Sequence, residues 1–151
     1  MMSKRVFLTL TAAALTVASP LLSGSADARH VADGLQVNVD VGGQNMQVYA
    51  DGRLIHRWSI STGRDGYDTP GGTYRPQRLE REWYSKKYDN APMPHSIFFS
   101  GGYAIHGTND TRRLGRTASH GCIRLAPGNA ARLFGLVQDY GAGRTRIIID
   151  N

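Results

Sequence analysis

The chain is organised around Ile105–Leu125, which reads IHGTNDTRRLGRTASHGCIRL. This stretch holds the only cysteine, Cys122, and two of the five histidines, His106 and His120. A thiol reacts as its thiolate, and a neighbouring imidazole, imidazolium or cluster of backbone amides can lower its pKa. A single cysteine beside histidines is therefore a candidate nucleophile.

The alternative for Cys122 is a small buried hydrophobic residue, the commoner role of a lone cysteine. Gly121 precedes it directly, which lets the backbone bend tightly and leaves nothing bulky to shield the sulfur. His106 is also followed by a glycine, Gly107, and lies sixteen residues upstream of Cys122, a separation that one loop can close. These neighbouring residues favour the interpretation of Cys122 as a nucleophile over that of a buried hydrophobic residue.

The combined pattern closely resembles the signature of the L,D-transpeptidase catalytic domain, the YkuD family. The resemblance rests on His106–Asn109 (HGTN) and Ser119–Leu125 (SHGCIRL), and it spans roughly Leu35–Asn151. Three further stretches are similar to that family: Gly101–Ile105 (GGYAI), Ser61–Gly63 (STG) and Thr69–Tyr74 (TPGGTY). The resemblance implies a mainly β fold, an L,D-transpeptidase-like β-sandwich of mixed sheets with one short helix after the catalytic cysteine.

Residues 1–28 have the pattern of a secretory signal peptide. Lys4 and Arg5 form a positive start, Val6–Ala18 an apolar core, and Ala26–Ala28 (ADA) a cleavage site. The apolar run is too short for a membrane anchor, because a spanning helix needs about 20 apolar residues. We therefore expect an exported protein of the periplasm or cell wall, with residues 29–151 forming a single catalytic domain and no stable membrane insertion after cleavage.

The chain is basic, with a formal net charge of +6, and it stays basic without the signal segment. A basic exported domain can meet nucleic acid or the anionic polymers of a cell wall. The basic residues are scattered and no nucleic-acid motif is present, so we expect no nucleic-acid partner. One cysteine allows no intramolecular disulfide, so a hydrophobic core must hold the fold. We expect no cofactor and no metal.

The first half of the domain has the alternation of half-buried strands. Apolar residues recur at every second position in Leu35–Val41 and again in Met46–Ala50. Asp51-Gly52 is a strong hairpin signal before a third strand at Leu54–Ile60. The pattern predicts an antiparallel meander.

The second half is less regular. Ser61–Pro76 reads as a loop with a short strand near Thr73, and its residues are expected to be scaffold. Apolar runs predict strands at Ser96–Ser100 and Tyr103–His106. Apolar residues at helical spacing then predict a helix from Pro127 to the closing Gly141, followed by a last strand at Arg144–Asp150.

Residues 78–94 mix aromatic and basic side chains without clean periodicity. They form either an exposed, solvated hairpin or a flap over the active site, the position at which the resembled family carries a variable lid. As a flap, its aromatic faces could pack on substrate while its Lys and Arg side chains attract carboxylates. The substrate-binding candidates are Arg124, Ser119, Tyr103, Trp83 and Tyr84.

The resemblance implies roles for the catalytic candidates Cys122, His106, Gly107, His120 and Gly121. His106 activates the thiol, and the Gly107 carbonyl orients its ring. The backbone amides of His120, Gly121 and Cys122 converge on the oxyanion, and losing one such donor typically costs about 3–4 kcal/mol. The His120 side chain is either a supporting group or part of the site wall.

Arg124 stands where the family often has asparagine, although an arginine form is also common. It is either a bidentate partner for a substrate carboxylate or a structural partner of a nearby aspartate.

The resemblance also implies the reaction. Cys122 attacks the bond between the third residue and the terminal D-Ala of a peptidoglycan tetrapeptide stem, forms a thioester, and passes the acyl group to a neighbouring stem as a 3→3 cross-link. Stem peptides are the expected partners and carbapenem-type compounds the expected inhibitors. The same site could serve an L,D-carboxypeptidase or endopeptidase, or a ligase or hydrolase that attaches proteins to peptidoglycan or releases them from it.

Two other classes remain open. A zinc set of His95, His106, His120 and Cys122 would make the protein a metallohydrolase. Alternatively, the chain could be a non-catalytic wall-binding module with an inert cysteine.

Overall fold

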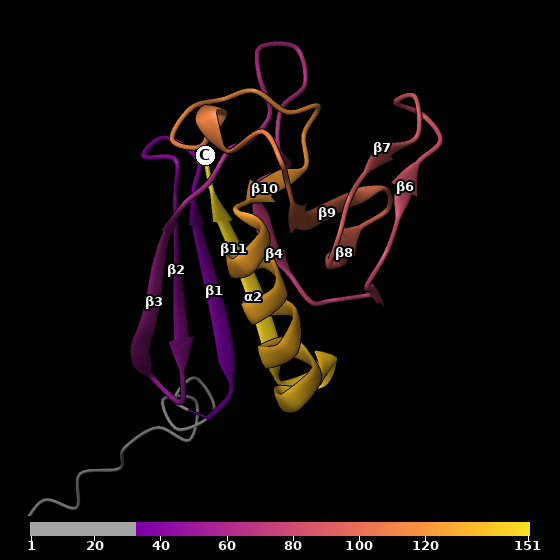
Figure 1. Cartoon of the computed structure of the whole chain (residues 1–151). Helices are drawn as coiled ribbons and strands as arrows, with labels where there is room; N and C mark the ends of the chain where they lie inside the picture. The colour runs from indigo at the N-terminus through magenta and orange to yellow at the C-terminus, as the bar shows by residue number, and fades with distance from the viewer. Residues whose placement is uncertain (1–32) are drawn as a thin grey trace, which may run out of the picture.

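Two mixed β-sheets share one hydrophobic core in the computed structural model, which describes residues 33–151 (Figure 1). The signal peptide predicted at residues 1–28 lies outside the described residues. The larger sheet has the order β3 (Arg53–Ser59), β2 (Asn45–Ala50), β1 (Leu35–Asp40), β11 (Thr145–Asp150) and β4 (Gly72–Tyr74). The smaller sheet has the order β10 (Ile123–Leu125), β9 (Tyr103–Gly107), β8 (Ser96–Ser100) and β5 (Arg78–Glu80).

The larger sheet confirms the predicted meander. β2 pairs antiparallel with both β1 and β3, and the alternating residues Leu35, Val37 and Val39 are buried. β11 then lies parallel to β1, with Val37 opposite Ile147. The last strand is therefore held in the middle of the sheet, and its apolar residues complete the inner face.

The smaller sheet places the central motif. β9 and β10 run parallel, with Ile105 opposite Ile123 and His106 opposite Arg124. Successive side chains of a strand point to opposite faces. Because Ile105 and Ile123 are buried in the core, His106 and Arg124 project from the other face of the sheet.

Helix α2 (Pro127–Tyr140) follows β10 directly and packs against β9. It begins with proline at its first position and ends at Gly141, whose φ of 82° lies in the left-handed region that glycine tolerates. Its buried stripe consists of Ala130, Leu133, Phe134 and Val137. Two short 3₁₀ helices are also present, η1 (Thr111–Arg113) and η2 (Ala142–Arg144). None of the helices formed by residues 33–151 is long and apolar enough to cross a membrane.

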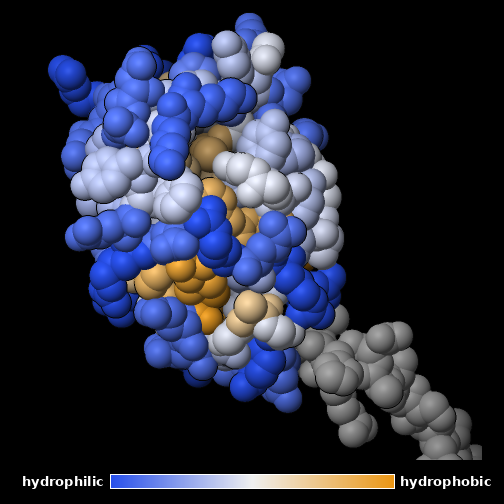
Figure 2. All heavy atoms as spheres, turned by 90° about the vertical axis from the view of Figure 1, so that its right-hand side faces the viewer, coloured by the Kyte–Doolittle hydropathy of each residue, from blue (hydrophilic) through white to orange (hydrophobic). Residues whose placement is uncertain are grey.

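The segment predicted as irregular at residues 78–94 begins with β5 of the smaller sheet, and its later part forms a small hairpin of β6 (Tyr84–Ser85) and β7 (Ala91–Pro92), which stands beside that sheet (Figure 1). We refer to residues 83–93 as the flap. At its base the Met93 amide donates to the Trp83 carbonyl at 2.7 Å. On the side of the molecule that carries the flap, apolar side chains reach the surface in a hollow bordered by hydrophilic residues (Figure 2).

Candidate active site

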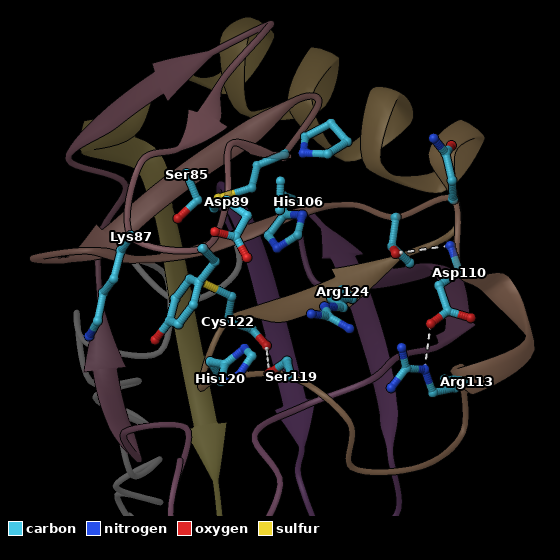
Figure 3. A pocket seen from close by; sticks show the side chains of 16 residues that line it. Ser85, Lys87, Asp89, His106, Asp110, Arg113, Ser119, His120, Cys122 and Arg124 are labelled. Carbon is cyan, nitrogen blue, oxygen red and sulfur yellow. Dashed lines mark hydrogen bonds and ion pairs between the residues drawn. The ribbon is translucent and has the colours of Figure 1, made fainter.

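A cavity of about 590 Å³ opens between the flap and the outward face of β9 and β10. It brings together side chains from the flap, from the loop that follows β9 and from the segment that leads into β10 (Figure 3). A second cavity of about 490 Å³ adjoins it and shares Cys122, His120 and several flap residues with it. The first is lined by Ser85, Lys87, Tyr88, Asp89, Ala91, Pro92, Met93, His106, Thr108, Asn109, Asp110, Arg113, Ser119, His120, Cys122 and Arg124.

The turn before Cys122 is held by a serine hydroxyl. Ser119 Oγ accepts the Gly121 amide at 3.0 Å and donates to the Cys122 carbonyl at 2.6 Å. Gly121 has a φ of 103°, and a Cβ at this position would collide with the Tyr103 ring. The amide of Gly121, expected to face an oxyanion, is thus engaged by Ser119. Ser119 was a substrate-binding candidate, but in the structure its hydroxyl is used to hold the turn.

A second brace comes from the loop after β3. Thr69 Oγ1 donates to the Gly121 carbonyl at 2.9 Å and accepts the Gly63 amide at 3.0 Å. The Arg64 amide donates to the Ser119 carbonyl at 3.1 Å. The residues at 61–63 and 69 therefore act as scaffold, as the sequence predicted, and they fix the path of the cysteine turn.

Cys122 is partly buried, against the expectation that glycine would leave its sulfur unshielded. Its side chain packs beside Met93, Phe98 and Ala104, and Sγ lies 3.9 Å from the Gly102 carbonyl oxygen. Burial raises the pKa of the thiol, while a hydrogen bond with the Ala104 backbone and the charge of Arg124 act in the opposite direction. The resting group is consequently a thiol that requires a base to ionise it.

His106 has the properties of such a base. It is 6% exposed, and its Nδ1 lies 2.7 Å from the Gly107 carbonyl oxygen. Because a carbonyl only accepts, Nδ1 carries the proton and Nε2 holds the free lone pair. Burial lowers the pKa of His106 to about 4; the Gly107 hydrogen bond opposes this effect and Arg124 adds to it. The ring is neutral near pH 7 and able to take a proton.

Gly107 also fixes the strand that carries this histidine. Its amide donates to the Pro94 carbonyl at 2.8 Å, and a Cβ at this position would come within 3.3 Å of the Ala130 Cβ on α2. The helix packs closely here only because residue 107 has no side chain. The Gly107 position therefore joins the flap base, β9 and α2.

His120 lies in the wall of the cavity. Its Nε2 is 2.8 Å from Arg64 Nη2, and since a guanidinium only donates, Nε2 is the acceptor. Its ring stacks on Tyr88 of the flap, with centroids 4.3 Å apart, and meets the edge of Tyr67 at 4.7 Å. Burial lowers its pKa, as do the charges of Arg64, Arg124 and Lys87. Of the two roles predicted for this side chain, its placement favours the wall.

Arg124 is half-buried on the same face as His106 and forms no ion pair with any residue in 33–151. Burial lowers its pKa, and the nearby charge of Arg113 acts in the same direction. The aspartate that could have paired with it, Asp110, instead binds Arg113 through Nε. Among the described residues, Arg124 therefore has no ion pair with an aspartate, the structural role considered for it above. The Arg124 guanidinium instead faces the cavity.

The flap adds one aromatic residue, Tyr88, to the cavity-lining candidates expected from the sequence. Trp83 packs edge-on against Phe98 and lines the smaller cavity, as does Tyr103. Tyr84 is 57% exposed and lines neither cavity. Tyr88 lines both. No periodicity distinguishes these tyrosines in the sequence, because the strands of the flap are only two residues long.

His95, the fourth member of the zinc set considered above, lies away from both cavities. Its ring packs against Phe134 of α2 at 5.5 Å. Within residues 33–151 no three His, Cys, Asp or Glu side chains are grouped so as to hold a metal ion.

Comparison with known proteins gives a consistent result. Residues 35–149 match the model of the family described as YkuD, L,D-transpeptidase catalytic domain. The chain is 28% identical over 155 aligned positions to a probable L,D-transpeptidase, ErfK/SrfK, of Escherichia coli strain K12, which covers 85% of this chain and 47% of that protein. It is 39% identical over 72 residues to a putative L,D-transpeptidase of Fuscovulum blasticum, covering 44% and 38% of the two chains.

Solved structures share the fold. An L,D-transpeptidase from Stackebrandtia nassauensis superposes with a TM-score of 0.69 at 27% identity, covering 85% of this chain and 62% of that one. One from Mycobacterium smegmatis gives 0.69 at 22% identity, covering 78% and 59%. A related L,D-transpeptidase, matched at a TM-score of 0.68, is bound to imipenem. The chain spans about half the length of the curated relatives, or less, and about three fifths of these structures.

Proposed function

Because the chain belongs to the L,D-transpeptidase catalytic-domain family, we propose that it is a cysteine-dependent L,D-transpeptidase which forms 3→3 cross-links between peptidoglycan tetrapeptide stems. The observation that carries the proposal is the pairing of two neighbouring strands. The parallel register of β9 and β10 puts His106 and the partly buried Cys122 into one cavity, and the Gly107 carbonyl leaves Nε2 of the histidine unprotonated.

The first step uses His106 as a general base. Nε2 takes the thiol proton as Sγ attacks the carbonyl carbon of the third residue of the donor stem. The tetrahedral centre collapses to a thioester, the C–N bond breaks, and His106 returns the proton to the amine of the departing D-Ala. A neutral imidazole with a pKa of about 4 starts this cycle in the protonation state that it needs.

The developing negative charge requires donors other than Gly121. Since Ser119 engages the Gly121 amide, the amides of His120 and Cys122 are the remaining donors of the turn. Arg124, which has no ion-pair partner in the described chain, is suited to the terminal carboxylate of the donor. That carboxylate lies one residue beyond the scissile carbonyl, and Arg124 lies two residues beyond Cys122 on the same strand face.

The second step transfers the acyl group to an amine. An amine of a second stem attacks the thioester carbonyl while His106 Nε2 takes its proton; the C–S bond breaks, a new amide forms, and His106 returns the proton to the Cys122 thiolate. We place this reaction in the periplasm or cell wall, in keeping with the signal peptide predicted from residues 1–28. Carbapenems should acylate the same sulfur, since a related structure in this fold carries imipenem.

Intact-protein mass spectrometry tests the proposal. The chain without residues 1–28 is incubated with a tetrapeptide muropeptide or with imipenem, beside its Cys122→Ala variant. We expect a mass increase equal to the acyl group on the native protein alone, and a 3→3 dimer when an acceptor stem is present. A folded native protein that gains no mass from either compound would contradict the proposal.

The fate of the acyl group separates the reactions open to one site. Release of tripeptide with no dimer would assign hydrolysis, and it would leave Cys122 as the nucleophile. Thermal unfolding of both proteins, followed by circular dichroism, serves as the control for folding.

A further inference from the structure

We propose that Arg113 is a specificity-determining residue that binds a second carboxylate of the donor stem, the one at the end of the diamino acid side chain. This inference rests on the proposed function, because it concerns the donor of that reaction. Arg113 lies in η1, in the loop between the two catalytic segments, and no motif in the sequence singles it out.

Arg113 is oriented by a carboxylate. Its Nε binds Oδ2 of Asp110, and the Asp110 amide is fixed in turn by Thr108 Oγ1 at 3.1 Å. A guanidinium has donors on all three nitrogens, so a bond at Nε leaves both Nη groups available. All three residues line the large cavity, and the Arg113 guanidinium points back toward Arg124 (Figure 3). The Arg113 guanidinium is therefore held in place through Nε, and its two Nη groups remain available to a ligand.

The charges at this end of the cavity are unbalanced. Arg113 and Arg124 are close enough for the charge of Arg113 to lower the pKa of Arg124, and the carboxylate beside them, that of Asp110, is bound by Arg113. Two guanidinium groups facing one carboxylate form a site that an added anion stabilises. An occupant with two carboxylates would satisfy both arginines.

We take the third residue of the donor to be a diamino dicarboxylic acid, which gives the donor two carboxylates at different reach from the scissile bond. Its terminal carboxylate is one residue away and lies within reach of Arg124. The carboxylate at the end of the diamino acid side chain is several bonds further out. Arg113 is the more distant arginine from Cys122 along this side of the cavity (Figure 3). The longer reach of the side-chain carboxylate suits Arg113, and the shorter reach of the terminal carboxylate suits Arg124.

The remaining basic residue in the wall fits this role less well. Lys87 belongs to the flap, at the other end of the cavity, where Asp89 lies on the same turn (Figure 3). Its Nζ lies 5.4 Å from the centre of the Tyr88 ring, and it has no ordering partner like that of Arg113 among the hydrogen bonds of residues 33–151. A planar fork also matches a carboxylate better than a single ammonium does.

Two synthetic tetrapeptide donors test the inference. They differ only at the end of the diamino acid side chain, which carries a free carboxylate in one and a carboxamide in the other. The measured quantity is kcat/KM for acylation of Cys122, followed by intact mass. We expect the native protein to prefer the carboxylate donor by about 10- to 100-fold, the usual range for a charge-assisted hydrogen bond. Arg113→Gln should bring this ratio close to one by slowing the carboxylate donor alone.

Arg112→Gln is the matched control. Arg112 is the preceding residue of the same short helix, is exposed and lines no cavity, so the change removes the same charge and should keep the preference. Arg113→Lys keeps the charge without the fork and should give an intermediate ratio. Both Arg113 variants should unfold at nearly the native temperature, because half of this side chain is exposed.

Three results would overturn the inference. A native protein with equal kcat/KM for the two donors has no such selectivity. An Arg113→Gln variant that is slowed equally on both donors would show that Arg113 acts on the shared part of the stem. If no donor acylates a folded native protein, the proposed function fails, and this inference fails with it.

Discussion

The site is built from two regions that the fold holds in different ways. The centre, consisting of Cys122, His106 and Arg124, is carried by two parallel strands whose inward residues are buried in the core. The wall around Tyr88 and His120 is carried by the flap and by loops, and its contacts are ring stacking and one guanidinium bond. The centre is fixed by sheet register, whereas the wall is assembled from side-chain contacts.

This difference separates chemistry from recognition. A strand pair braced by buried apolar residues keeps the proposed base and the proposed nucleophile at constant spacing, which is what proton transfer requires. A wall held by aromatic contacts can change with little cost to the core. We therefore expect large kinetic losses from changes in the centre and small losses from changes in the wall.

The strongest test compares the two histidines of the motif. His106→Gln removes the base, and general base catalysis contributes roughly 10²- to 10⁴-fold. We expect acylation by a muropeptide to slow by at least about 10²-fold. His120→Gln removes a wall group and should change the rate by less than about tenfold, since the loss is ring stacking and one exposed hydrogen bond from Arg64. Single-turnover acylation of both variants measures this. Equal losses of acylation rate in the two variants would contradict the division of the site into a centre and a wall.

Acid stability tests the environment of the central histidine. The pKa of His106 falls from 6.5 to about 4 on folding, because burial disfavours its charged form. Between these values the unfolded chain binds a proton that the folded chain does not. The stability is therefore complete above pH 6.5 and declines as the pH falls toward 4. At pH 4.5 the loss from this group is about 2–3 kcal/mol.

Urea unfolding of the native protein and His106→Gln at pH 7 and pH 4.5 measures this effect. The variant lacks the titrating group, so its stability should fall less over the same interval. His120 is a useful contrast: its pKa is also lowered on folding, but its ring is much less buried than that of His106, so His120→Gln should change the pH dependence less than His106→Gln does. An identical decline in the native protein and His106→Gln would show that the His106 ring is not the source.

The centre was predictable from the sequence to a greater extent than the wall. Alternation at Leu35–Val41 gave the first strand, and the glycine-flanked motif named His106 and Cys122. Their resting state was not predictable, because the raised thiol pKa depends on packing against Met93 and Phe98, which are distant in the sequence. The motif also could not show that Ser119 engages the Gly121 amide, a contact set by the shape of the turn.

The wall escaped prediction for a different reason. Which flap tyrosine faces the cavity depends on the path of a turn between two-residue strands, where no repeated pattern exists. Arg64 and Tyr67 come from a loop whose position is set by pairing with residues 119–124. Basic and aromatic residues are common in surface loops, so their presence in the sequence did not mark this loop as part of the site. Their meeting at His120 is a property of the tertiary structure.

A glycine substitution tests the turn that joins the two regions. Gly121→Ala places a methyl group against the Tyr103 ring at a φ of 103°, which costs of order 1–3 kcal/mol in backbone strain alone. We expect acylation to slow by about 10-fold or more because the cysteine turn moves, which shifts the amides that are proposed to bind the oxyanion. Gly102→Ala is the matched control, since its φ is ordinary and no atom lies within 4 Å of the added methyl group. If both variants react at the native rate, the turn is not the constraint described above.

The smallest expected effect lies within the flap and compares two tyrosines four residues apart. Tyr88→Ala removes the ring that stacks on His120 and lines both cavities, so the KM for a muropeptide donor should rise several-fold, as loss of one aromatic contact of about 1 kcal/mol implies. Tyr84→Ala removes a ring that is 57% exposed and lines neither cavity, so its KM should stay at the native value. Neither change touches the strand pair, so kcat should be preserved in both. A Tyr84 variant that lost as much as the Tyr88 variant would mean that the flap acts as a whole and that the wall has no fixed contact surface.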